Sequence, residues 1–209
     1  MELKERIIEE AIRSYMKFGI RHVTMDDIAN NLAISKRTLY EVFKDKNELI
    51  ATCMESLTQM QEARYIELQE ESSNVLELMI RNMQEGIEAI NKINPVFFSD
   101  LKKYYPIIWD QKHREHREKG MNHIHTQLRK GVNEGFFRKD IDLKLVTKLF
   151  HEQINLLGDD QIFPKDEFNF ADLFKNLVIN FLRGISTQKG IDLIDQVFKL
   201  TNEQTQNFE

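Results

Sequence analysis

The chain of 209 residues is poor in cysteine, proline and glycine, with one, three and eight of each. A single cysteine, Cys53, cannot form a disulfide within the chain, which favours a reducing, cytoplasmic setting. So few prolines and glycines argue against a loop-rich β fold and against a disordered tail. No apolar run reaches the ~18–20 residues of a membrane span, and the N-terminus lacks the apolar stretch of a signal peptide. We therefore expect a cytoplasmic protein that does not enter a membrane.

The chain also lacks an excess of positive charge. Its net charge of −5 by itself disfavours nucleic acid as a partner. The charge is unevenly distributed, however. Residues 1–50 hold nine Lys and Arg against nine Asp and Glu, so the negative excess falls in residues 51–209. Within residues 36–46 four cations stand against two anions, so any attraction to phosphate is local and weaker than in a basic protein.

Catalytic and metal-binding patterns are missing as well. The chain has no GxSxG, P-loop or HExxH pattern and no glycine fingerprint. His113 and His116 are three residues apart, and His123 and His125 are two apart, a spacing at which helical side chains do not face each other. We interpret this stretch as a charged, solvated helix face, with a metal between His113, His116 and a carboxylate as the alternative. We expect no enzyme, no catalytic residue, no metal and no cofactor.

The first fifty residues contain a close succession of helix start and stop signals. Apolar residues at helical spacing predict a helix over 3–18, which Gly19 ends. Thr24 is an N-cap with an acid three residues later, and it opens a second helix. The turn after that helix contains Ala33, and Ser35 caps a third helix. These signals predict a compact three-helix domain of the helix-turn-helix type.

From about residue 47 the pattern changes to longer helices. Asp45 and Glu48 form a further capping box, which opens a helix at Lys46 or Asn47. We see no strand-like alternation and expect an all-α fold, with a tail that frays after Thr201. The expected helices cover about 47–70, 74–92, 95–104, 106–134, 143–157, 167–186 and 190–200.

The third helix has one apolar and one polar side. At 100° per residue its apolar residues gather on one side, namely Leu39, Val42 and Phe43. On the other side Arg37 can donate two hydrogen bonds to a guanine edge, and the hydroxyls of Thr38 and Tyr40 suit phosphate oxygens. Glu41 can accept from a cytosine amine or pair with Arg37. The alternative is a face that is merely solvated. The expected DNA contacts are Thr24, Ser35, Lys36, Arg37, Thr38, Tyr40, Lys44 and Lys46.

Residues 5–50 resemble the DNA-binding domain of the TetR family of transcriptional regulators. The resemblance is carried by Phe18-Gly19, by VTMDDIA at 23–29 and by ISKRTLYEVFKDK at 34–46. It implies a DNA-binding domain at 1–47 followed by a larger helical domain for ligand binding and dimerisation at 48–209.

The resemblance also implies roles for single residues. Positions matching Thr38, Tyr40 and Lys46 touch the DNA backbone in the family, and those matching Lys36 and Arg37 lie near bases or phosphates. Two departures stand out. The family usually has glycine at the position of Ala33, where a left-handed conformation would cost about 1 kcal/mol. It often has a small residue at the position of Arg37. We therefore expect Arg37 to give this chain a DNA sequence preference different from that of such relatives.

Two helices of the larger part have apolar surface to spare. The apolar arcs of 143–157 and 167–186 exceed the ~100° stripe that a one-sided surface helix needs. This excess indicates burial against a second copy, and the resemblance implies a four-helix dimer interface. The alternative is burial within one monomer. The expected interface residues are Leu149, Leu157, Phe170, Leu173, Leu177 and Phe181.

Large soft side chains in the remaining helices suit a small-molecule pocket, which the resemblance also implies. The alternative is that they are ordinary core residues. His151, on an apolar helix, is expected in the core or interface, or else as a polar contact in the pocket. The expected pocket residues are Met79, Met83, Phe97, Phe98, Tyr104, Tyr105 and Trp109.

Together these features predict a ligand-responsive, dimeric repressor of a double-stranded DNA operator, with a small apolar or aromatic effector. The alternative within the same class has no small-molecule ligand and is constitutive or controlled by a protein partner. A third possibility is an enzyme built on a helical bundle, which would need clustered acids or histidines facing a cavity.

Overall fold

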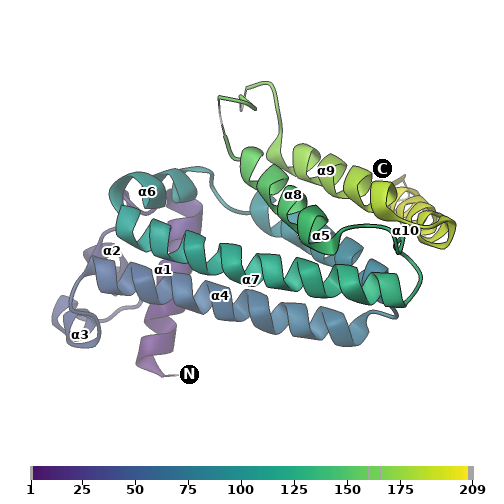
Figure 1. Ribbon diagram of the computed structural model, residues 1–209. Helices are drawn as coiled ribbons and strands as arrows, with labels where there is room; N and C mark the ends of the chain where they lie inside the picture. The colour runs from purple at the N-terminus through teal and green to yellow at the C-terminus, as the bar shows by residue number, and fades with distance from the viewer. Residues whose placement is uncertain (1, 160, 165, 207–209) are drawn as a thin grey trace. The chain divides into compact units, whose positions relative to one another are not determined.

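The structure, a computed structural model, describes residues 2–159, 161–164 and 166–206, and within them all side chains except those of 113, 116 and 198–206. Over these residues the chain forms ten helices and one isolated β-bridge, between Phe137 and Ser186, so the all-α prediction is confirmed (Figure 1). The helices are α1 (Leu3–Phe18), α2 (Met25–Asn31), α3 (Lys36–Val42), α4 (Lys46–Glu71), α5 (Val75–Asn91), α6 (Val96–Tyr104), α7 (Pro106–Asn133), α8 (Leu143–Leu156), α9 (Phe170–Ile185) and α10 (Gln188–Gln206).

The helix boundaries differ from the prediction at two places near the C-terminus. α9 begins at Phe170 rather than at 167, because Asn169 is its N-cap and accepts a hydrogen bond from the backbone N–H of Ala171 at 2.8 Å. α10 continues to Gln206, beyond the expected end near residue 200, and the expected fraying after Thr201 stays a prediction.

The chain forms two compact units that interleave in sequence. The first combines the chain up to Tyr65 with Ala89–His116, and the second combines Ile66–Glu88 with the chain from Arg117 onward. The boundaries of these compact units differ from the predicted functional boundary at 47/48, because α6 lies in the same unit as the N-terminal helices. The assignment of DNA binding to 1–47 and of ligand binding and dimerisation to 48–209 stays a prediction.

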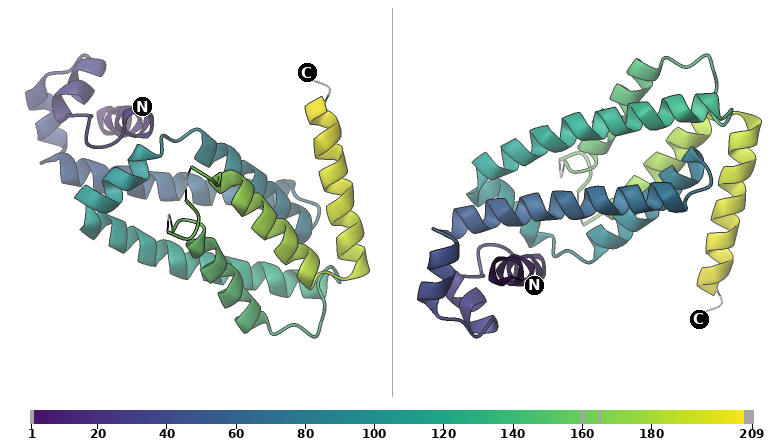
Figure 2. Two further views of the ribbon diagram at one scale, coloured as in Figure 1. Left: turned by 90° about the horizontal axis from the view of Figure 1, so that it is seen from above. Right: turned by 90° about the horizontal axis from the view of Figure 1, so that it is seen from below.

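The core of the first unit fixes the three N-terminal helices on the start of α4. α1 contributes Ile7, Ala11 and Tyr15, and α3 contributes Leu39, all of them almost completely buried. α2 and α3 lie at the N-terminal end of α4 (Figure 2). Because a helix of seven residues is too short to be stable in water on its own, α2 and α3 depend on this burial.

The segment before α6 and α6 itself hold the C-terminal end of α1. Asn94 donates from its backbone N–H to the Met16 carbonyl at 2.9 Å and from its side chain to the Lys17 carbonyl at 3.1 Å. The buried carboxylate of Asp100 accepts from the Arg21 backbone N–H at 2.8 Å. Two carbonyls that the C-terminal end of α1 leaves without intrahelical partners are thereby satisfied, as is the N–H of Arg21 in the loop that follows.

Gly19 is required at this junction for two reasons. Its φ of 83° lies in the region that favours glycine. A Cβ there would also lie 2.8 Å from a methyl carbon of Val96, closer than side chains pack. The stop signal read from the sequence is thus also a contact site for α6.

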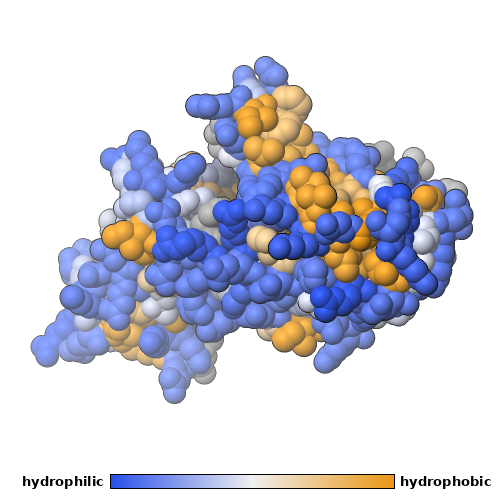
Figure 3. Space-filling model, in the orientation of Figure 1, coloured by the Kyte–Doolittle hydropathy of each residue, from blue (hydrophilic) through white to orange (hydrophobic). Residues whose placement is uncertain are grey.

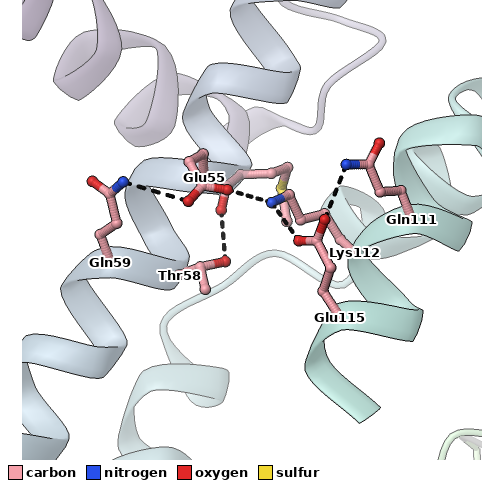
Figure 4. A network of polar contacts seen from close by, with 7 residues as sticks. Glu55, Thr58, Gln59, Gln111, Lys112 and Glu115 are labelled. Carbon is pink, nitrogen blue, oxygen red and sulfur yellow. Dashed lines mark hydrogen bonds and ion pairs between the residues drawn. The ribbon is translucent and has the colours of Figure 1, made fainter. Parts of the chain in front are cut away.

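A polar cluster links α4 and α7 within the first unit (Figure 4). The Lys112 ammonium lies 2.5 Å from a carboxylate oxygen of Glu55 and 2.8 Å from one of Glu115. Burial lowers the pKa of Lys112, but the hydrogen bonds to the two carboxylates outweigh it and raise this pKa. This pairing could not be predicted from local patterns, because the two helices are far apart along the chain.

The core of the second unit is aliphatic and aromatic. Leu76 and Ile80 of α5 are fully buried, as is Leu182 of α9. The rings of Phe150 on α8 and Phe181 on α9 stack with centroids 4.0 Å apart, so α8 and α9 pack side by side. No helix of the described part of the chain is both long enough and apolar enough to cross a membrane.

The turn between α2 and α3 confirms the backbone requirement expected at Ala33. Its φ is 54°, the one positive φ of a non-glycine residue in the described ranges. The Ile34 N–H donates to the Ala29 carbonyl at 3.0 Å and the Ala33 N–H to the Asn30 carbonyl at 3.0 Å. The turn therefore forms with an alanine in a strained, left-handed conformation.

We predict that Ala33→Gly raises the free energy of unfolding by about 0.5–1 kcal/mol, because glycine adopts this φ without a Cβ clash. Urea unfolding followed by circular dichroism measures the change. Ala51→Gly is the matched control: Ala51 is exposed within α4, where the same substitution should destabilise by about 1 kcal/mol. Equal destabilisation by both substitutions would contradict the strain at Ala33.

Candidate nucleic-acid interface

The start of α2 is fixed by the predicted capping box. The Thr24 hydroxyl accepts from the Asp27 N–H at 3.1 Å, and the Asp27 carboxylate accepts from the Thr24 N–H at 2.8 Å. The hydroxyl of Thr24 also donates to Asp27 at 2.7 Å, and these hydrogen bonds lower the pKa of Asp27. Thr24 remains exposed at the end of the helix.

α3 is capped as predicted, and its apolar side is buried. The Ser35 hydroxyl accepts from the Thr38 N–H at 3.0 Å and lies 2.8 Å from the Thr38 hydroxyl. Leu39 is 0% exposed and Phe43, the C-cap residue, is also buried, whereas Val42 is half-buried. With this side buried, the opposite side faces solvent.

Arg37 stands on the exposed side of α3, with 88% of its side chain accessible. Its Nε donates to Glu41 at 2.9 Å, so of the two roles considered for Glu41 the structure shows the pairing with Arg37. This contact leaves the two Nη groups of Arg37 as donors. A guanidinium held in this way has the fork geometry that recognises a guanine edge or a phosphate.

Lys36 is exposed but has an ionic partner. Its ammonium lies 2.9 Å from the carboxylate of Asp26, on the first turn of α2, and 6.0 Å from the centre of the Tyr40 ring. The hydrogen bond to Asp26 raises the pKa of Lys36. Sequence reasoning missed Asp26, although its place in an acidic first turn beside the turn to α3 was a signal. Any phosphate that Lys36 binds must compete with this carboxylate.

Lys46 differs most from the surface role expected of it. It is half-buried at the first position of α4, and its ammonium donates to the Ile20 carbonyl at 2.6 Å. Burial lowers its pKa. The structure gives Lys46 an internal contact that ties the loop after α1 to α4, and its contact with DNA stays a prediction.

The opening of α4 forms the expected capping interactions with one shift. The Asp45 carboxylate accepts from the Glu48 N–H at 2.9 Å, as predicted. The Glu48 carboxylate reaches back to the Lys44 N–H at 2.7 Å rather than to that of Asp45. Lys44 and Tyr40 are exposed on the same short stretch, so cations and hydroxyls flank the accessible side of α3.

The comparison with protein families matches this segment. Residues 7–53 fit the family model described as bacterial regulatory proteins, tetR family. This match, together with the relatives and solved structures described below, supports a TetR-family transcriptional regulator. These findings support a DNA-binding regulator, and the matched segment contains α2 and α3.

Relatives of this TetR-family chain extend beyond the motif. It is 25% identical over 194 residues to the uncharacterized HTH-type transcriptional regulator YvaF of Bacillus subtilis, covering 91% of this chain and 99% of that protein. It is 26% identical over 149 residues to the HTH-type transcriptional repressor KstR2 of Mycobacterium tuberculosis, covering 70% and 74%.

Solved structures share the fold. A transcriptional regulator from Cytophaga hutchinsonii superposes with a TM-score of 0.72 at 18% identity, covering 88% of this chain and 98% of that one. The ketosteroid transcriptional regulator KstR2 of Mycobacterium tuberculosis superposes with a TM-score of 0.52 at 22% identity, covering 90% and 96%. At these identities the likeness shows the fold alone.

The residues predicted to line one effector pocket are divided between the two units of this TetR-family regulator. Met79 and Met83 are buried in the core of the second unit, and Phe97 is buried in the core of the first. Tyr105 and Trp109 pack against that first core, whereas two others, Phe98 and Tyr104, are exposed. The predicted single pocket stays a prediction.

The residues predicted for the dimer interface lie on α8, at its C-cap and on α9, with different exposures. Leu149 is 53% exposed, Leu157 is buried, and four of the set are half-buried, namely Phe170, Leu173, Leu177 and Phe181. Leu145 and Leu156, two apolar residues outside the predicted interface set, are 55% and 47% exposed on α8. Figure 3 shows apolar residues gathered over α8 and α9.

The alternative metal site falls on side chains outside the described part of the chain, since those of His113 and His116 are not described. Among the described residues no group of three His, Cys, Asp or Glu side chains is placed to hold a metal ion. His151 is buried in α8, as expected of a core histidine.

We predict that Asp26→Asn tightens DNA binding about three- to tenfold, because it removes the competitor of Lys36 and a negative charge near the phosphates. Fluorescence anisotropy with a labelled duplex at fixed salt measures the dissociation constant. Asp172→Asn, at an exposed aspartate in the first turn of α9, is the matched control and should leave it unchanged. Weaker or unaltered binding by Asp26→Asn would contradict the competition.

Proposed function

We propose that the chain is a dimeric repressor that places α3 of each subunit in the major groove of an operator and is released by a small apolar effector. The observation that supports the DNA contact best is the two-sided character of α3. Leu39 anchors the helix from one side, while Arg37, Tyr40 and Lys44 are exposed on or next to the other. A short helix held in this way fits the major groove, which is about 12 Å wide.

Each exposed group has a distinct task in this proposal. Arg37 reads a base edge through its Nη groups while Glu41 orients it through Nε. Lys36, Tyr40 and Lys44 contact phosphates, and the hydroxyls of Thr24, Ser35 and Thr38 do the same at the helix starts. Phosphate contacts set the register of the helix, and the arginine contact supplies sequence preference.

Dimerisation is supported by the exposed stripe on α8. Leu145, Leu149 and Leu156 fall within an arc of about 40° at 100° per residue, and each is about half exposed. The half-buried apolar residues of α9 lie on the neighbouring helix. A two-fold interface is self-complementary, so the same stripe of a second copy would cover it. Two reading helices would then bind two half-sites.

The effector is supported by chemistry rather than by a defined cavity. The second unit has soft apolar side chains, Met79 and Met83, in the same unit as two buried polar ones, Gln127 and His151. An apolar molecule with one polar end would suit a pocket lined by side chains of these kinds. KstR2, a relative, is a ketosteroid transcriptional regulator, which fits this class. An effector that binds best to dimers with another spacing between their two α3 helices shifts the population toward those dimers. The affinity for the operator then falls.

One observation favours the alternative without a small molecule. Met79, Met83 and Phe97 are all packed into cores, with at most 7% of their surface exposed. If these cores are fully packed in solution, regulation would come from a protein partner or be absent. Thermal unfolding across a panel of apolar acids, ketones and sterols separates the two, because a ligand that binds the folded state raises the melting temperature.

We predict that Arg37→Ala combined with Tyr40→Phe weakens binding to the DNA upstream of the chain's own gene at least tenfold, because a base contact and a phosphate contact are lost together. Gel-shift titration measures the change. Arg138→Ala, at an arginine of the second unit, is the control and should bind as the wild type does. Unchanged affinity of the double variant would refute the contact assignment.

We predict that Leu149→Glu converts the dimer to a monomer, because it buries a charge at the centre of an apolar interface. Sedimentation velocity should show the wild type at about twice the 24.8 kDa chain mass and the variant at that mass. Ile66→Glu, at an equally exposed apolar residue of α4, is the control and should stay dimeric. A monomeric wild type, or a variant that remains dimeric, would exclude this interface.

A further inference from the structure

Lys4 lies outside the helix-turn-helix but next to its reading helix. It is exposed in the first turn of α1, and its ammonium is 5.8 Å from the centre of the Phe43 ring. Phe43 is the C-cap residue of α3 and is itself buried, and Lys44 follows it on the surface. Two lysines from distant parts of the sequence therefore flank the C-terminal end of α3.

The cations near α3 differ in whether they already have a partner. Lys36 is paired with Asp26, Arg37 with Glu41, and the Lys46 ammonium is bound by the Ile20 carbonyl. Lys4 and Lys44 have no ion pair or hydrogen bond from their ammonium groups within the described residues. These two can bind phosphate without first breaking an internal ion pair or hydrogen bond.

The length of α3 places this end near a phosphate strand. Seven residues at 1.5 Å each give a helix about 10 Å long, against a groove about 12 Å wide. A helix of this length lying in the groove brings groups just beyond its end to the groove wall. We infer that Lys4 is a phosphate-contacting residue that positions α3 from outside the helix-turn-helix.

The charge around Lys4 makes this a short-range contact. Glu2 and Glu5 lie in the same turn, where the Glu5 carboxylate accepts from the Glu2 N–H at 3.0 Å. The first turn of α1 is therefore not a basic patch that attracts DNA from a distance. Lys4 supplies one ammonium group to one phosphate. Binding of that group would release one counterion from the DNA per subunit.

The test is the salt dependence of DNA binding. This inference rests on the proposed DNA contact by α3, so the wild type is measured first, with a duplex from the upstream DNA and with a random-sequence duplex. Failure of the wild type to bind either duplex would refute the proposed function itself. Where the wild type binds, a plot of log K against log salt concentration has a negative slope. Lys4→Ala should make this slope shallower by about 0.9 per subunit on both duplexes.

Lys17→Ala is the matched control, because Lys17 lies at the other end of α1 and its ammonium is 5.0 Å from the Phe18 ring. It should keep the wild-type slope, and Lys4→Arg should restore it. Unchanged urea unfolding of Lys4→Ala shows that folding is intact. A wild-type slope in Lys4→Ala, or an equal loss in Lys17→Ala, would overturn the inference.

Discussion

The position of α3 depends on the burial of Leu39 and Phe43 in the first core, to which α1, α2 and α4 also contribute. A helix of seven residues has little stability of its own, so its conformation comes from this apolar contact and from the Ser35 cap. The contact also decides which residues face outward. Once Leu39 is at 0% exposure, the helical repeat leaves Arg37 and Tyr40 in solvent. The chemistry of the surface is thus set by the packing beneath it.

The charge of the exposed side of α3 depends on carboxylates as well as on cations. Asp26 and Glu41 hold Lys36 and Arg37 in the unbound protein, and the net charge of residues 1–50 is zero. General attraction to DNA is therefore weak, and binding depends on a few groups placed at the right positions. Such an arrangement favours selectivity over bulk affinity, since a phosphate bound by Lys36 replaces its internal ion pair with Asp26.

The N-terminal part was predictable because its signals are local. Thr24, Ser35 and Asp45 each satisfy backbone groups within a few residues, and Gly19 and Ala33 adopt the φ values that a helix end and a tight turn require. Those signals need no knowledge of the rest of the fold. The ten helices of the described residues follow from the same rules and from apolar spacing.

Contacts between distant segments could not be predicted in this way. The pairing of Lys112 with Glu55 spans 57 positions, and the approach of Lys4 to Phe43 joins the two ends of the DNA-binding segment. The hydrogen bond of the Lys46 ammonium to the Ile20 carbonyl joins two further separated segments. The buried residues predicted for the pocket are divided between the two cores, because apolar spacing marks residues as buried without saying which core buries them.

The most direct test of two α3 helices in the major groove is dimethyl sulfate protection of the bound operator. The reagent methylates guanine N7 in the major groove and adenine N3 in the minor groove, so it distinguishes the two faces of the duplex. The account predicts protected guanines in two patches whose centres lie about 10 base pairs, or a multiple of that, apart. A single patch, or protection confined to adenine N3, would contradict it.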